Sequence, residues 1–312
     1  MSTVPFGHPF NVFAPAKLNI RLKITGKRSD GYHKLVSLMV PVDLFDHMVL
    51  KFIDEPRINV TCRGFSAPAN ADNLVCRATK VFFSQINWQK GLSIELNKRI
   101  PVAAGLGGGS SDAAAILMAL NETLSASRPL FPQEILAEMA LNLGADVPFF
   151  LRRGPCIAHG IGEILEPVYE WPSLSYVIVM PDISVSTAWA YKSLGLQSSE
   201  SATKDRRELE LTKDECYYMI RNLEKMPMEA CRLLENDLER VTMKRFPIIK
   251  KIKKSLTDAG AIGALMSGSG PSVFGVFESE TSAINAKLIL DGASFGQVFV
   301  VKGINSWGVV KW

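Results

Sequence analysis

The sequence predicts an α+β protein folded as two lobes. Short segments in which apolar residues recur at every second position, as in half-buried strands, lie among longer segments of helical spacing. The 312 residues are enough for two domains of ordinary size, and no internal repeat stands out. The lobes are expected to join between residues 163 and 176. This gives an N-terminal lobe over residues 1–165 and a C-terminal lobe over residues 166–312.

Strands and helices are mixed throughout the first lobe. Residues 13–25 predict a strand, because Leu18, Ile20 and Leu22 alternate with polar or charged neighbours, and Lys17 lies near its start. An Asp-Gly turn follows. Two further strands are expected within residues 35–53, a helix over 73–86, a strand over 91–101, and helices over 111–121 and 132–144.

The second lobe is expected to contain strands, helices and one polar excursion. Residues 196–214 are polar and are the best candidate for a mobile segment. A helix is expected over residues 247–260, where Ile248, Ile252 and Leu256 recur every four positions before a terminating glycine. A second helix is expected over residues 216–226. Strands are expected over residues 162–168, 174–183 and 296–310, and a further strand at the end of the segment 262–277.

Composition and charge are those of an ordinary soluble globular protein. Hydrophobic residues make up 47% and charged residues 21%, and the net charge of +4 falls short of a nucleic-acid-binding footprint. The lysines within residues 250–254 are more typical of a solvated helix face than of an RNA site. No apolar run is long enough to span a membrane. Five dispersed cysteines and a start without a secretory pattern predict a cytoplasmic location.

The stretch PVAAGLGGGSSDAAA, residues 101–115, places four glycines and two serines before a helical pattern. Glycines let backbone N–H groups approach a ligand, Ser110 or Ser111 can cap the helix, and the helix dipole attracts anions. These features predict a phosphate-binding loop, although a plain tight turn before a capped helix explains them equally well. The stretch is not a Walker loop, and Ser110 stands where the dinucleotide fingerprint needs its third glycine.

Two further motifs shift this balance. The segment APAKLN, residues 14–19, precedes the glycine loop, and SGSGPSVFGVF, residues 267–277, follows it as a second glycine-rich turn. In this order the three motifs resemble the superfamily of galactokinase, homoserine kinase, mevalonate kinase and phosphomevalonate kinase (GHMP kinases). The resemblance implies a two-lobed fold, with a mixed sheet and helices in the N-terminal lobe and an antiparallel sheet and helices in the C-terminal lobe. It also makes the central loop the site of the ATP phosphates.

Two more segments resemble one branch of this superfamily. GKRSDGYH, residues 26–33, and LGADVPFFL, residues 143–151, are similar to the 4-diphosphocytidyl-2-C-methyl-D-erythritol kinases. The resemblance implies transfer of the γ-phosphate of ATP to the 2-hydroxyl of the methylerythritol unit, in non-mevalonate isoprenoid precursor synthesis. The alternatives are a kinase of homoserine or mevalonate type, which the DGYH segment disfavours, and a nucleotide sensor without catalysis.

Two residues are expected to act on the reacting groups. The sequence alone favours a local hydrogen bond for Asp146 at a helix end, but the resemblance makes it the general base that accepts the proton of the substrate hydroxyl. Lys17 reads as an ordinary strand lysine by itself. By resemblance it lies beside Asp146 and the transferring phosphate, where it keeps the aspartate ionised and offsets phosphoryl charge.

The resemblance also implies the binding residues. Tyr32 stacks on the cytosine and His33 hydrogen-bonds it. Asn19 is two residues beyond Lys17, so it is expected to share the same face of the strand and to contact the substrate. The expected substrate-binding residues are Asn19, Tyr32, His33, Thr187 and Tyr191. The expected ATP-binding residues are Asn73, Pro101, Val102, Ala103, Ala104, Gly105, Leu106, Gly107, Gly108, Gly109, Ser110 and Ser111.

The expected partners are small molecules. Magnesium arrives with ATP, Ser110 and Ser111 are expected to contact phosphate or Mg²⁺, and the other protein ligands of the metal stay unassigned. Neither nucleic acid nor membrane is expected as a partner. The chain is expected to be a monomer or a weak homodimer.

Overall fold

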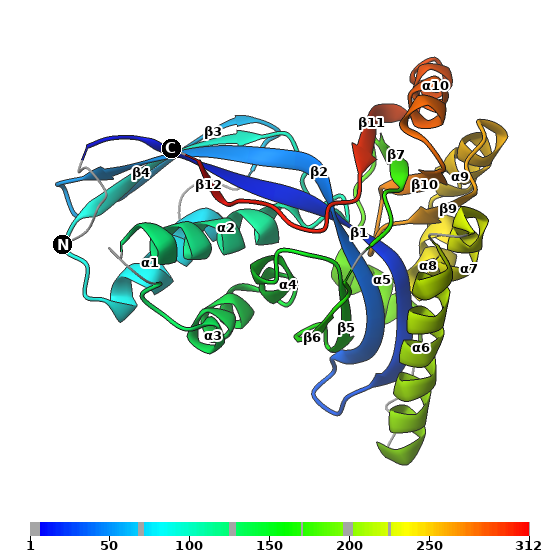
Figure 1. Ribbon diagram of the computed structural model, residues 1–312, viewed down its shortest axis with the longest axis horizontal. Helices are drawn as coiled ribbons and strands as arrows, with labels where there is room; N and C mark the ends of the chain where they lie inside the picture. The colour runs from blue at the N-terminus through cyan, green and yellow to red at the C-terminus, as the bar shows by residue number, and fades with distance from the viewer. Residues whose placement is uncertain are drawn as a thin grey trace.

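The chain folds into two sheets flanked by helices (Figure 1). The computed structural model describes residues 7–67, 72–124, 129–169, 171–195, 202–223 and 226–311. Its strands are β1 Phe10–Lys27, β2 His33–Ile53, β3 Ile58–Gly64, β4 Gly91–Lys98, β5 Cys156–Gly160, β6 Ile164–Pro167, β7 Ser175–Pro181, β8 Glu235–Asn236, β9 Gly263–Met266, β10 Val273–Phe277, β11 Gly296–Lys302 and β12 Val310–Lys311. Its α-helices are α1 Leu74–Gln85, α2 Gly108–Thr123, α3 Gln133–Leu143, α4 Val147–Leu151, α5 Thr187–Ser193, α6 Ala202–Leu223, α7 Ala230–Leu233, α8 Asp237–Arg245, α9 Ile248–Asp258 and α10 Glu280–Asp291.

The first sheet is mixed and is covered on one face by helices. Its strand order is β12-β1-β2-β4-β3, with β1, β2 and β4 antiparallel and β3 parallel to β4. The hairpin β5–β6 extends it from β2, and the short strand β8 joins β1 in parallel. Helices α1 and α2 lie against this sheet, and α3 and α4 pack on these two helices (Figure 1). The apolar side chains of the four helices fill one core with those of the strands. The helices expected over 73–86 and 132–144 and the strand over 91–101 are confirmed.

The second sheet is antiparallel and smaller. Its order among the described strands is β11-β7-β10-β9. A second core joins the two sheets, because Leu18 of β1 and Val36 of β2 share it with Tyr176 of β7 and Phe274 of β10. The predicted α+β fold with a mixed and an antiparallel sheet is confirmed. The division at residue 165 stays a prediction, and it falls at the β6 strand that ends the β5–β6 hairpin.

Two expectations about the first sheet are wrong. Residues 35–53 form one strand rather than two, because β2 continues through a bulge: Pro15 pairs with Phe45 and the next residue pairs with Val42. The bulge accommodates extra residues of β2 without ending the strand, at the place where the sequence suggests the end of one strand and the start of another. Lys17 lies well inside β1, which begins at Phe10.

Two expectations about the second half also need correction. The polar stretch from residue 202 is the first part of helix α6 and not an excursion, whereas residues 196–201 lie outside the described residues. In α9 the buried face contains Ile249, Ile252 and Leu256, while Ile248 is only half-buried. Spacing of three and four residues therefore replaces the expected spacing of four. No helix in the described parts of the chain is long and apolar enough to cross a membrane.

Candidate active site

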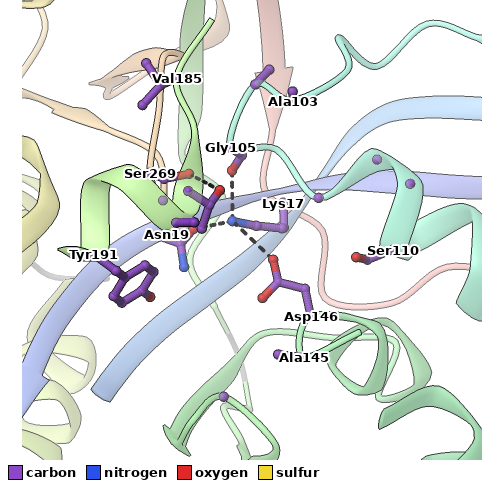
Figure 2. A pocket seen from close by; sticks show the side chains of 18 of the residues that line it. Lys17, Asn19, Ala103, Gly105, Ser110, Ala145, Asp146, Val185, Tyr191 and Ser269 are labelled. Carbon is purple, nitrogen blue, oxygen red and sulfur yellow. Dashed lines mark hydrogen bonds and ion pairs between the residues drawn. The ribbon is translucent and has the colours of Figure 1, made fainter. Parts of the chain in front are cut away.

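Lys17 is buried at the centre of a cleft between the two glycine-rich turns. Its neighbours in β1 are apolar and packed, so the strand holds the side chain in place with only 3% of the residue exposed. The ammonium group donates hydrogen bonds to the Gly105 carbonyl oxygen at 2.8 Å and to the side chain of Asn19. It lies 4.0 Å from the Asp146 carboxylate, and Figure 2 shows these groups converging on it. The expectation that Asn19 shares the face of Lys17 is confirmed.

The charge of Lys17 is only partly offset by its surroundings. Burial lowers the pKa of Lys17 from its ordinary value, and the nearby Asp146 carboxylate opposes that shift. A buried ammonium group without an adjacent anion is costly. Asp146 therefore neutralises the Lys17 ammonium only in part, and a further anion such as a phosphate would be attracted to it.

Asp146 is held by an apolar helix but keeps its carboxylate available. It occupies the N-cap position of α4, whose five residues are all buried. Its side chain makes no capping hydrogen bond, unlike the local bond that the sequence alone favours, and it is 47% exposed. The helix anchors the backbone while the carboxylate points toward Lys17 (Figure 2). This arrangement suits a group that accepts a proton from a bound ligand.

The glycine loop connects β4 to α2 beside Lys17. Gly105 and Gly107 have φ values of 78° and 73°, a left-handed conformation that other residues rarely adopt. A Cβ atom on Gly105 would also collide with the Ser267 carbonyl oxygen. The loop therefore needs glycine for its backbone shape.

The expected serine cap of α2 is wrong. The helix begins at Gly108 with Gly107 as N-cap, and no side chain caps it. Ser110 and Ser111 already lie in its first turn, which leaves the N-terminal backbone N–H groups for a ligand. Ser110 lines the cavity, whereas Ser111 is buried and its hydroxyl has no partner among the described residues.

The second glycine turn packs directly on the first. The Ser267 hydroxyl donates to the Gly105 carbonyl oxygen at 3.0 Å and accepts from the Asn19 backbone N–H at 3.2 Å. The Asn236 amide donates to the carbonyl oxygens of Met266 and Gly268. Sequence reasoning found this turn as a motif but missed Ser267 and Asn236, because nothing in their local sequence distinguishes them from ordinary turn and capping residues.

An aromatic group forms the other end of the site. The His33 ring lies 5.2 Å from the ring of Tyr191, which comes from α5, and Tyr32 is 60% exposed beside them. Burial, with the charge of Lys27, lowers the pKa of His33, so the imidazole is neutral near pH 7. Thr187, the first residue of α5, shares a hydrogen bond of 2.8 Å with the Ser269 hydroxyl.

One cavity of about 940 Å³ joins the glycine loop, Lys17, Asp146 and the aromatic group. Its volume is near the upper end of the range for small-molecule sites, which suits two ligands that meet end to end. All predicted site residues line it except Leu106 and Ser111. Leu106 is buried, and its carbonyl oxygen accepts from the Lys17 backbone N–H at 2.9 Å. Lys98 and Asp112 also line the cavity, and sequence reasoning missed both.

Comparison with known proteins first defines the class. Residues 73–154 match the model of the N-terminal domain of GHMP kinases, and residues 219–295 match that of their C-terminal domain. A solved homoserine kinase from Cytophaga hutchinsonii has a TM-score of 0.72 at 22% identity, over 100% of this chain and 99% of that chain. At that identity the likeness shows the fold alone, which is the GHMP kinase fold.

Closer relatives then define the branch. A solved 4-(cytidine 5'-diphospho)-2C-methyl-D-erythritol kinase has a TM-score of 0.75 at 30% identity, over 95% of this chain and 100% of that chain. A 4-diphosphocytidyl-2-C-methyl-D-erythritol kinase from Citrifermentans bemidjiense is 45% identical over 88% of this chain and 92% of its own length. The chain belongs to the family of 4-diphosphocytidyl-2-C-methyl-D-erythritol kinases.

Proposed function

We propose that this chain transfers the γ-phosphoryl group of ATP to the 2-hydroxyl of 4-diphosphocytidyl-2-C-methyl-D-erythritol, a step of isoprenoid precursor synthesis. The observation that carries the proposal is the meeting of three groups in one cavity. The Lys17 ammonium lies 2.8 Å from the Gly105 carbonyl oxygen of the phosphate loop and 4.0 Å from the Asp146 carboxylate. An alcohol bound beside Asp146 would therefore face a phosphate bound at the loop.

Asp146 is assigned to the acceptor alcohol. Its carboxylate is not used by a helix cap, so its oxygen atoms are available to a ligand hydroxyl. A carboxylate within hydrogen-bond reach of that hydroxyl accepts its proton as the new P–O bond forms and the bond from the γ-phosphorus to the bridging oxygen of ATP breaks, which releases ADP. Lys17 stays fixed between the two substrates because β1 and the Gly105 carbonyl oxygen hold it. Its positive charge stabilises the negative charge that develops on the phosphoryl oxygens in the transition state.

The glycine loop is assigned to the ATP phosphates. The left-handed glycines turn the backbone so that the uncapped first turn of α2 faces the cavity. N–H groups and the helix dipole there attract negative charge without a side chain in the way. Phosphoryl transfer requires mainly positioning and charge neutralisation, which this loop and Lys17 together supply.

Magnesium is assigned to the nucleotide and not to a protein cage. The Asp146 carboxylate and the Ser110 hydroxyl at the cavity are oxygen donors, the type that Mg²⁺ takes. When bound with the nucleotide, the ion neutralises charge on the phosphates. Among the described residues, no group of three His, Cys, Asp or Glu side chains is placed to hold a metal ion.

The aromatic end of the cavity is assigned to cytosine. A neutral His33 imidazole can donate from one nitrogen and accept at the other, which matches the polar edge of the base. Tyr32 and Tyr191 offer ring faces for stacking. Thr187 is placed by its bond to Ser269 at the boundary between this end and the second glycine turn.

The test is a phosphorylation assay with Mg-ATP and three alcohols. The purified chain is expected to phosphorylate 4-diphosphocytidyl-2-C-methyl-D-erythritol, with kcat/KM at least about 10³ above homoserine and mevalonate, because those lack the base that the aromatic end would recognise. The product is identified by ³¹P NMR and mass spectrometry. Equal turnover of homoserine, or ATP binding with no transfer to any alcohol, would reject the proposal.

A further inference from the structure

Three buried charged residues lie beneath the glycine loop. Lys98 ends β4, Asp46 comes from β2, and Asp112 comes from the second turn of α2. Each is at most 3% exposed. The Lys98 ammonium donates to the Asp46 carboxylate and to Asp112 Oδ2, the latter at 2.7 Å. We call these three residues the loop-base cluster.

The loop-base cluster contacts both ends of the glycine loop. Asp46 Oδ1 accepts hydrogen bonds from the backbone N–H groups of Arg99 and Ile100, at 2.6 and 2.9 Å. These are the first two residues after β4. At the other end, Asp112 ties the start of α2 to the same ammonium group. The loop between them is therefore fixed at its entry and at its exit by one set of charges.

We propose that Lys98 is a positioning residue for nucleotide binding: with Asp46 and Asp112 it fixes the distance and direction between β4 and α2, and so the shape of the phosphate loop. This inference rests on the proposed nucleotide site and deepens it. Lys98 acts through the loop backbone and not by chemistry on the substrate. A Cβ atom on Gly108 would lie 3.1 Å from the Lys98 ammonium nitrogen, so the ammonium supports the first helical turn from below.

The composition of the loop-base cluster supports a positioning role over a stabilising one. Two carboxylates share one ammonium group, and Asp112 Oδ1 has no partner among the described residues. Burial acts to raise the pKa of Asp112, and the Lys98 charge opposes this. Buried ion pairs are a weak source of stability, because desolvation offsets their attraction. Here these ion pairs fix the orientation of the end of β4 relative to the start of α2.

Because two carboxylates pair with one ammonium group, removing Asp112 gives a specific test of the cluster. Asp112→Ala cuts the tie between Lys98 and α2 but leaves Lys98 and Asp46 as a one-to-one pair, so no buried charge loses its only partner. The expected result is a rise of about tenfold in the Kd for ADP, because a loop that must be ordered on binding weakens affinity. The thermal midpoint and the KM for the alcohol are expected to stay near those of the wild type. Asp112→Asn keeps an oxygen acceptor for Lys98 and should recover the ADP affinity.

The matched control is Asp54→Ala. Asp54 also pairs with a lysine, Lys90 at 3.1 Å, but it is on the surface and away from the cavity. It should leave the ADP affinity unchanged. The inference is overturned if Asp112→Ala binds ADP as the wild type does, or if its affinities for ADP and the alcohol fall together with its thermal midpoint. ADP binding is measured without the alcohol, so failure of the proposed phosphorylation does not affect this comparison.

Hydrogen exchange on the wild type gives a second test that needs no variant to fold. The amides of Arg99 and Ile100 are expected to exchange as slowly as those of β4, because Asp46 accepts from both. The following loop residues, such as Val102, should exchange much faster. Fast exchange at residues 99 and 100 would show that the entry of the loop is not clamped and would overturn the inference.

Discussion

At the scale of single residues, the proposed chemistry depends most on Asp146. Asparagine has the same shape as aspartate but does not accept a proton, so Asp146→Asn is expected to lower kcat by roughly 10² to 10⁴ while leaving KM within about twofold. Steady-state kinetics with both substrates measures this split. The exposed Asp54 provides the control, since Asp54→Asn should leave kcat unchanged. Wild-type turnover in Asp146→Asn would remove this residue from the base role.

A second single-residue effect concerns Gly107. An added Cβ atom would lie 2.9 Å from Phe150 Cζ and 3.1 Å from Lys17 Cγ, and the φ of 73° disfavours any side chain. Gly107→Ala should therefore displace Lys17 as well as the loop, lowering kcat and ATP affinity each by about tenfold or more. Isothermal titration with an ATP analogue and steady-state assays check both. Unchanged ATP affinity would count against a close approach of this backbone to the phosphates.

At the scale of elements, a substitution at Gly260 separates the effect of backbone strain from that of a steric collision. It follows α9 with φ of +95°, and nothing lies within 4 Å of where its Cβ would be. Gly260→Ala should lower the free energy of unfolding by about 1 kcal/mol, through the left-handed backbone alone. Denaturant unfolding measures this. Because α9 is remote from the cavity, kinetic constants should not change, which also makes this variant the control for Gly107→Ala.

Regular elements were predictable where periodicity alone decides their structure. The strand β4 and the helices α1 and α3 follow apolar patterns of period two or of helical spacing. Prediction failed where a neighbour decides. The β2 bulge is set by its pairing with β1, and the start of α2 is set by Gly107 adopting a left-handed conformation. The first part of α6 has too few apolar residues to be recognised as a helix from sequence.

At the scale of the whole molecule, the site exists only because distant segments converge. The glycine loop is predicted from its own residues, whereas the roles of Lys17 and Asp146 come from the resemblance. Their contact needs β1, α2 and α4 together. The loop-base cluster has no sequence signal, because Asp46, Lys98 and Asp112 are separated by 52 and 14 positions. Such a cluster follows from the topology that makes β2 and β4 neighbours. Local patterns cannot reveal it.

The two sheets are also joined by helix α6. Cys216, Ile220 and Leu223 of this helix are buried in the core that β1, β2 and β7 share. In Figure 1 the helix lies alongside the long strands β1 and β2. A polar contact fixes it at one side: Glu166 of β6 accepts from Lys213, from Tyr217 at 3.1 Å, and shares a bond of 2.9 Å with His159.

Glu166→Gln tests how far this contact stabilises the whole fold. Burial acts to raise the pKa of Glu166. The hydrogen bond and charge of Lys213, with the hydrogen bonds of Tyr217 and His159, outweigh this effect, so the pKa in the folded state is lowered. A lowered pKa contributes stability above the unfolded-state value, which is lost as pH falls through the folded-state value. At pH 7 the variant should lose about 1 kcal/mol of unfolding free energy, because solvent screens a side chain that is 32% exposed and so weakens its hydrogen bonds to charged groups.

The difference between Glu166→Gln and the wild type should therefore shrink as the pH falls below about 4.5, the unfolded-state range of glutamate. Urea unfolding at several pH values measures it. Glu280→Gln is the matched control, because Glu280 pairs with Lys302 at 2.7 Å on an exposed surface where such pairs contribute little. Equal losses in the two variants, or a loss for Glu166→Gln that does not depend on pH, would mean that α6 is held by its apolar face alone.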